Sequence, residues 1–212
     1  YKRQLLGYRA ATNATGNSNV AVGPNAALFM QGGNYNISMG YYALRGEEGD
    51  ANGGCNIGIG CHTGNDITDG GNNVFIGNAV GCTITTGCCN VLIGHYAGFG
   101  LSNTNGYNIA IGYQAMVGTN HTGRAQNVCI GYQTLNPATS ASWNVAIGHQ
   151  AAMRVTSGNY NTIIGYKAGE HTGQASYNCL FGAYAGRYLT GNVSGGGSNV
   201  CIGAYSANAN TC

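Results

Sequence analysis

Charged residues are scarce in this sequence, and their scarcity narrows the classes of function. They make up 7% of the 212 residues, and the formal net charge is only +2. Proteins that bind nucleic acid usually carry a basic patch or stripe, and the sequence contains no such stripe. We therefore expect no nucleic-acid partner.

The motifs of common enzyme classes are missing as well. The chain has no nucleophile elbow, no phosphate-binding loop and no pair of carboxylates spaced for acid–base work. No pair of cysteines has metal-ligand spacing with histidines nearby. The acidic run of Glu47, Glu48 and Asp50 has ligands suited to calcium, but we interpret it as a solvated loop. The sequence predicts a protein that is not an enzyme and needs neither a metal nor another cofactor.

The N-terminal segment lacks the long apolar core of a signal peptide or membrane span. Leu5 and Leu6 form a short apolar run and stand among basic residues. We expect residues 1–16 to be a cap or a junction to an upstream segment, and the chain to be a processed piece without membrane insertion.

Glycine and repetition are abundant. The chain has 38 glycines and is 43% hydrophobic, which is too apolar for disorder and too glycine-rich for a helical protein. The unit Asn90-Val91-Leu92-Ile93-Gly94 occurs in eleven versions, most often 17 residues apart. Such a fixed period predicts a solenoid. The sequence therefore predicts an all-β, parallel β-solenoid over residues 17–207, with residues 208–212 as a C-terminal tail or junction.

Two residues of the unit never vary. We expect the glycine to occupy a turn with positive φ or a corner too tight for a Cβ, and the asparagines to form a hydrogen-bonded ladder. The asparagines are Asn19, Asn36, Asn56, Asn73, Asn90, Asn108, Asn127, Asn144, Asn161, Asn178 and Asn199. The glycines are Gly23, Gly40, Gly60, Gly77, Gly94, Gly112, Gly131, Gly148, Gly165, Gly182 and Gly203.

The three residues between Asn and Gly alternate like a strand. The first and third, such as Val91 and Ile93, are mostly β-branched, and we expect them to face the interior of the coil. The middle residue is also small or apolar, and a strand that is apolar on both faces is usually buried on both. We therefore predict a subunit interface along the middle positions. Its candidate residues are Ala21, Phe75, Leu92, Ala110, Cys129, Ala146, Ile163, Leu180 and Cys201.

The rest of each repeat is polar. A small residue such as Ala97 follows three places after the glycine, and we expect it to begin a second, shorter strand. Longer spacings mark insertions at residues 45–54, 117–126 and 188–198, which predict loops suited to binding. Eleven coils about 4.8 Å apart would form a rod about 50 Å long.

Twelve of the 15 tyrosines occupy three positions that flank the strand. One interpretation is aromatic stacking along the rod; the other is an exposed aromatic track for sugars. The candidate glycan contacts are Tyr41, Tyr113, Tyr132, Trp143 and Tyr166.

Nine cysteines are many for this length. Cys129, Cys179 and Cys201 occupy strand positions and are interpreted as small core residues. Disulfides between adjacent coils are plausible at turns, and an odd total leaves one thiol over. The candidates are Cys55, Cys61, Cys82, Cys88 and Cys89.

Repeats such as Asn108-Ile109-Ala110-Ile111-Gly112 and Asn144-Val145-Ala146-Ile147-Gly148 resemble two groups of proteins. These are the head domains of trimeric autotransporter adhesins and the repeat region of phage tail fibres. The adhesin resemblance implies a left-handed β-roll in which three chains pack side by side. The 17-residue period and the many cysteines depart from the adhesin pattern.

These observations lead to one main functional hypothesis and two alternatives. The first is a trimeric phage tail-fibre segment, part of the virion, that contacts host-surface glycans or a receptor. The second is a bacterial cell-surface adhesin or an extracellular filament whose subunits stack end to end. The third is an ice-binding solenoid, although the threonines form no unbroken outward array.

Overall fold

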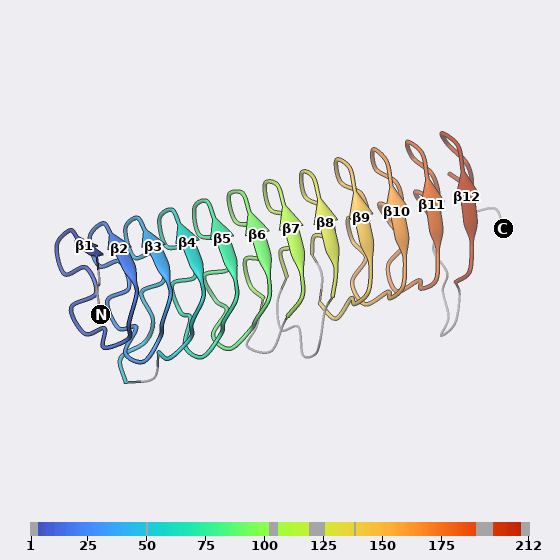
Figure 1. Ribbon diagram of the computed structural model, residues 1–212. Coiled ribbons are helices and arrows are strands. Elements are labelled where there is room, and N and C mark those ends of the chain that lie inside the picture. The colour runs from blue at the N-terminus through green and yellow to red at the C-terminus, as the bar shows by residue number, and fades with distance from the viewer. Residues whose placement is uncertain are drawn as a thin grey trace.

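The computed structural model describes residues 4–49, 51–101, 106–118, 126–137, 139–189 and 197–208. It is an elongated solenoid in which each coil contributes one three-residue strand to a single parallel sheet, in chain order (Figure 1). The strands are β1 (Gln4–Leu6), β2 (Val20–Val22), β3 (Ile37–Met39), β4 (Ile57–Ile59), β5 (Val74–Ile76), β6 (Val91–Ile93), β7 (Ile109–Ile111), β8 (Val128–Ile130), β9 (Val145–Ile147), β10 (Thr162–Ile164), β11 (Cys179–Phe181) and β12 (Val200–Ile202). The predicted all-β parallel solenoid is confirmed. No helix in these ranges is long and apolar enough to cross a membrane.

The register of the sheet follows the sequence repeat. Leu92 of β6 pairs with Ala110 of β7, so equivalent repeat positions lie in columns along the rod. The segment expected to be a cap adds a further strand, because Leu5 of β1 pairs with Ala21 of β2 in the same register. The repeat unit alone did not reveal this coil, since Arg3 stands where the other copies have Asn.

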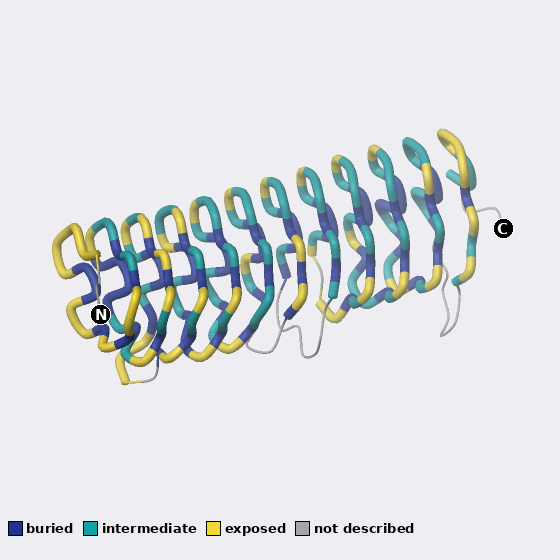
Figure 2. The backbone as a smooth tube through the Cα atoms, viewed as in Figure 1, coloured by how far each residue is buried: buried dark blue, intermediate teal, exposed yellow. Residues whose placement is uncertain are grey.

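The prediction of which strand face lies inside was wrong. In the strands from β2 to β12 the middle residue is buried, whereas the first and third are half-buried or exposed (Figure 2). Alternation shows which residues share a face but not which face is inside, and both faces are apolar here. The proposed interface residues therefore form the core of their own chain. They are Ala21, Phe75, Leu92, Ala110, Cys129, Ala146, Ile163, Leu180 and Cys201.

The core is narrow, so glycines stand where bulky side chains enter it. Phe75 is the largest fully buried side chain. A Cβ on Gly64 would lie 2.7 Å from the Phe75 ring, and a Cβ on Gly58 would lie 2.5 Å from Cγ of Leu44. These two glycines make room for their bulky neighbours, as close packing of interiors requires.

The expected second strand is absent from the described coils, and a turn takes its place. The small residue after the glycine is buried, as at Ala115, and begins no strand. Its neighbours Gln114 and Met116 have φ values of 49° and 56°. Gln114 N–H donates to His95 O in the preceding coil, and Met116 N–H donates to Thr134 O in the next. The backbone therefore directs the amides of Gln114 and Met116 to the coils on opposite sides, while the amide of Ala115 bonds to Gly112 O within its own coil.

The invariant glycine meets both expectations. Its φ lies between +109° and +140° in every coil, a region that side chains rarely adopt. At Gly94 an added Cβ would also lie 2.4 Å from the carbonyl oxygen of Gly112. Only glycine allows neighbouring coils to approach this closely.

The invariant asparagines form the predicted ladder. Asn161 is 1% exposed, and its Nδ2 donates to Asn144 Oδ1 at 2.9 Å and to Ala175 O at 2.9 Å. Its own Oδ1 accepts from the backbone N–H of Asn178 at 3.0 Å and from Asn178 Nδ2 at 2.8 Å. Each amide thus satisfies buried polar groups of its own coil and of the coils on both sides.

Candidate functional site

The outward face of the sheet is an apolar stripe along the rod. We call it the outer strand face; it consists of the first and third strand residues from β2 to β12. It is exposed over part of its surface, as at Ile37 (36%), Met39 (41%) and Ile109 (37%). Eleven strands about 4.8 Å apart and about 10 Å long give it an area of about 500 Å². Contiguous apolar patches of this size commonly mark interaction sites.

Aromatic rings form a stacked column beside this face, at the position directly after the glycine. His95, Tyr113, Tyr132, His149 and Tyr166 stack in succession, with ring centroids between 4.8 and 5.5 Å apart. The Tyr113 and Tyr132 planes are inclined by only 9°. The predicted stacking is confirmed for this column. Because each ring covers the face of the next, the column presents mainly ring edges to solvent.

The five candidate glycan contacts lie in two columns at opposite ends of the strand. Tyr113, Tyr132 and Tyr166 belong to the stacked column, and Tyr41 occupies the same repeat position but contacts Tyr42 and His62. Trp143 belongs to the column before the asparagine, where it stacks on Tyr160 at 4.9 Å. All five are 42–45% exposed. The structure thus provides two aromatic edges and does not gather the five rings in one site.

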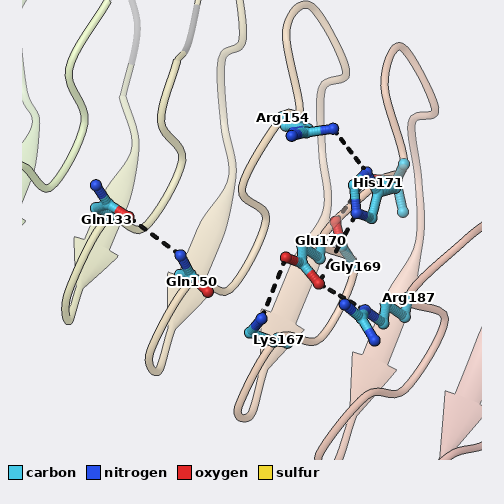
Figure 3. Close-up of polar contacts among 9 residues, drawn as sticks. Gln133, Gln150, Arg154, Lys167, Gly169, Glu170, His171 and Arg187 are labelled. Carbon is cyan, nitrogen blue, oxygen red and sulfur yellow. Dashed lines mark hydrogen bonds and ion pairs between the residues drawn. The ribbon is translucent and has the colours of Figure 1, made fainter.

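A compact charged group, which the sequence analysis missed, lies at a turn corner of three successive coils. We call it the charged corner: Arg154, Lys167, Glu170, His171 and Arg187. Glu170 is only 7% exposed and lies at its centre (Figure 3). Its carboxylate accepts a hydrogen bond from Arg187 Nε at 2.6 Å and lies 3.5 Å from Lys167 Nζ. His171 Nε2 is 3.9 Å away.

Arg154 lies at the other side of His171, with Nη1 3.4 Å from His171 Nδ1. Partial burial lowers the pKa of His171, and the charges of Arg154, Arg187 and Lys167 act in the same direction, opposed by Glu170. Arg187 also loses hydration, but its hydrogen bond and ion pair with Glu170 outweigh this and raise its pKa. The corner therefore favours the neutral form of His171.

Tyrosines border the charged corner. Tyr188 stacks on His171 with ring centroids 5.0 Å apart, and the Arg187 guanidinium lies 4.8 Å from its centroid. Arg187 also lies 5.1 Å from the centroid of Tyr184. Burial is the largest of the causes that raise the pKa of Tyr184. The corner thus combines cations, rings and phenol hydroxyls.

The spacing of these residues is the signal that would have revealed the corner. Arg154, His171 and Tyr188 follow one another at intervals of 17, as do Glu170 and Arg187. At the solenoid period, such residues must lie in adjacent coils. The same spacing predicted the columns of asparagine, glycine and tyrosine, whereas the charged residues form no column of like residues.

The predicted disulfides do not form. Cys55, Cys61, Cys82 and Cys89 are free thiols, so Cys88 has no disulfide to any of them. Cys55 and Cys89 share a column, but Asn72 lies between them, and Cys61 and Cys82 occupy other positions of the repeat. Burial, followed by the charge of Asp66, raises the pKa of Cys82 to about 11. Cys212 lies outside the described residues.

Metal ligands do not cluster in the part of the chain that is described: no three His, Cys, Asp or Glu side chains gather there as a metal site would need. Asp50 of the acidic run lies outside that part, as do most of the insertions at 117–126 and 188–198.

Comparison with known proteins gave no family assignment. No protein-family model, no curated protein and no solved structure matched the chain.

Proposed function

We propose that the protein is a structural and adhesive fibre segment that assembles as a homotrimer and contacts host-surface glycans. The outer strand face is the observation that carries this proposal. A monomer would leave its two columns of Val, Ile and similar residues in water, while side-by-side packing of chains would bury them. Packing along this face leaves both aromatic columns at the borders of the interface.

A phage tail fibre is the setting we favour, on the resemblance of repeats such as Asn144-Val145-Ala146-Ile147-Gly148 to the repeat region of those fibres. In this setting the stacked coils supply a stiff shaft, because each coil bonds to both neighbours through the strand, the asparagine ladder and the turns. The exposed ring edges and the charged corner supply polar and aromatic groups on its surface.

The residues of the outer strand face do not favour the ice-binding alternative. An ice-binding face would need a regular array of hydroxyls, whereas Thr162 is the only threonine in the first and third strand positions.

Native mass in solution tests the assembly. Light scattering behind a sizing column should give three times the chain mass of 21.7 kDa, with and without reductant because Cys55, Cys61, Cys82 and Cys89 are free thiols. A monomer would contradict the trimer, and the apolar face would then need a different partner. An assembly that lengthens without limit would favour the end-to-end filament.

A further inference from the structure

The charged corner carries an excess of positive charge. Its Arg154, Lys167 and Arg187 face one carboxylate, Glu170, which leaves two positive charges in excess. The whole chain has eight Lys and Arg and six Asp and Glu, for a net charge of +2. The remaining five cations and five acids are equal in number.

No other acid of the chain is near enough in sequence to neutralise the corner. The other five acidic residues all lie between residues 47 and 69, in the coils of β3 and β4. Five coil spacings of about 4.8 Å place the coil of β4 about 24 Å from that of β9. The Debye length at physiological ionic strength is only about 8 Å. The excess charge thus calls for an anion from outside this chain.

Glu170 holds two cations of the charged corner but neutralises only one positive charge. The carboxylate holds Arg187 and Lys167, and its side chain is 9% exposed, so an external ligand does not meet it directly. Arg154 is exposed and contacts His171, whose pKa is lowered by partial burial and by its basic neighbours. Arg154 therefore retains donors for an incoming carboxylate or sulfate, which arginine binds with two parallel hydrogen bonds.

The residues around the cations suit a sugar. Tyr184 and Tyr188 each lie beside the Arg187 guanidinium. Phenol hydroxyls both donate and accept hydrogen bonds, as sugar hydroxyls require, and ring edges offer apolar contact. A small inorganic anion would use only the cations, whereas an acidic sugar would use both kinds of group.

We propose that the charged corner binds the acidic group of a carboxylated or sulfated carbohydrate, with Arg154 as the principal contact and Lys167 and Arg187 in support. This inference rests on the proposed function, and it specifies the class of glycan that the fibre contacts.

Calorimetric titration of the full chain with 3′-sialyllactose and with lactose tests the proposal, because the two sugars differ by one acidic residue. We expect 3′-sialyllactose to bind at least about tenfold more tightly, because its carboxylate adds a charge-assisted hydrogen bond that lactose cannot form. Binding should weaken as salt is added. A sulfated lactose in a third titration shows whether the carboxylate or the sulfate is preferred.

Arg154→Gln and Arg9→Gln form a matched pair of variants. Both arginines are exposed, both have positive φ, at 70° and 54°, and both changes remove one charge. Arg154→Gln should weaken binding of the acidic sugar by about tenfold. Arg9→Gln, in the coil of β1, should leave it nearly unchanged.

Three outcomes would overturn the proposal in distinguishable ways. Equal binding of lactose and the acidic sugars, or equal loss in the two variants, rejects the charged corner while glycan contact stands. Equally tight, Arg154-dependent binding of inorganic polyphosphate shows an unselective anion patch. Absence of binding to any of the three sugars rejects the corner, and a neutral-glycan panel then decides whether glycan contact itself fails.

Discussion

The side-chain amide of Asn178 donates a hydrogen bond to the amide oxygen of Asn161 at 2.8 Å, although 17 residues separate them. The same contact joins most pairs of neighbouring coils, and it links the most regular feature of the sequence to the stability of the rod.

Asn161→Ala should destabilise the protein by about 2–4 kcal/mol. The change removes two hydrogen bonds donated by Nδ2 and leaves the buried N–H of Asn178 without its acceptor. Chemical denaturation followed by circular dichroism measures the loss. Asn52→Ala is the control, because Asn52 is exposed and lies outside the ladder. Equal stability of the two variants would show that the ladder contributes little.

Gly94→Ala and Gly203→Ala separate backbone strain from collision between coils. Both glycines have positive φ, at 132° and 109°. A Cβ at Gly94 would lie 2.4 Å from Gly112 O, whereas one at Gly203 would have no described atom within 4 Å. We expect Gly94→Ala to lower the unfolding free energy by several kcal/mol, and Gly203→Ala by about 1–2 kcal/mol. Similar losses of stability in the two variants would show that the positive φ alone, and not collision between coils, requires glycine at this position.

Val145→Lys and Ala146→Lys test the two faces of β9. Val145 lies on the outer strand face, so its replacement should keep the coil folded but reduce the native mass to that of one chain. Ala146 is fully buried, and a lysine there should prevent folding, because an unpaired charge would enter the core. Light scattering and circular dichroism report the two effects. A trimer that survives Val145→Lys would place the interface elsewhere.

Mild acid should destabilise the charged corner. The pKa of His171 is lowered in the folded protein by partial burial and by its basic neighbours, so the unfolded chain, with a histidine pKa near 6.5, binds the proton more readily. Below about pH 6.5, therefore, protonation favours unfolding, and stability falls as pH falls. The melting temperature at pH 5.5 should lie below that at pH 7.5. His171→Gln should reduce this difference, and Arg9→Gln should preserve it.

The thiols of Cys55 and Cys82 should differ in reactivity. Cys55 is exposed, whereas burial and Asp66 raise the pKa of Cys82 to about 11. At pH 8 such a thiol is only about 0.1% thiolate, and the thiolate is the reactive form. Brief treatment with a maleimide, followed by peptide mass spectrometry, should find Cys55 modified well before Cys82. Faster modification of Cys82 would contradict the assigned environment.

Periodicity was sufficient to predict the fold, because equivalent positions of a solenoid must lie in columns. Asn161 and Gly94 could be assigned from spacing and from the conformations that amides and glycines allow. The face of the strand that is buried in the core could not be assigned from the sequence, because Val145 and Ala146 are both apolar. Only packing decides that the small side chain fits the narrow core. Gly58 and Gly64, which leave room for large neighbours, show how that core is filled.

The charged corner was not predicted from the sequence, for a different reason. Arg154, Glu170 and Arg187 belong to single repeats, so they have no column of like residues to mark them. The repeat period predicts that they lie close together. The charged site can be recognised, however, only when residues one period apart are compared with each other. In a protein with so few charges, this comparison of unlike residues at the repeat spacing locates the site.

The asparagine ladder and the glycine corners join each coil only to the one before and the one after. Gain or loss of a whole repeat would therefore change the length of the rod by one strand spacing, about 4.8 Å, without altering the contacts of distant coils. Duplication of repeats can therefore change the distance between a surface site and one end of the rod without changing the site itself.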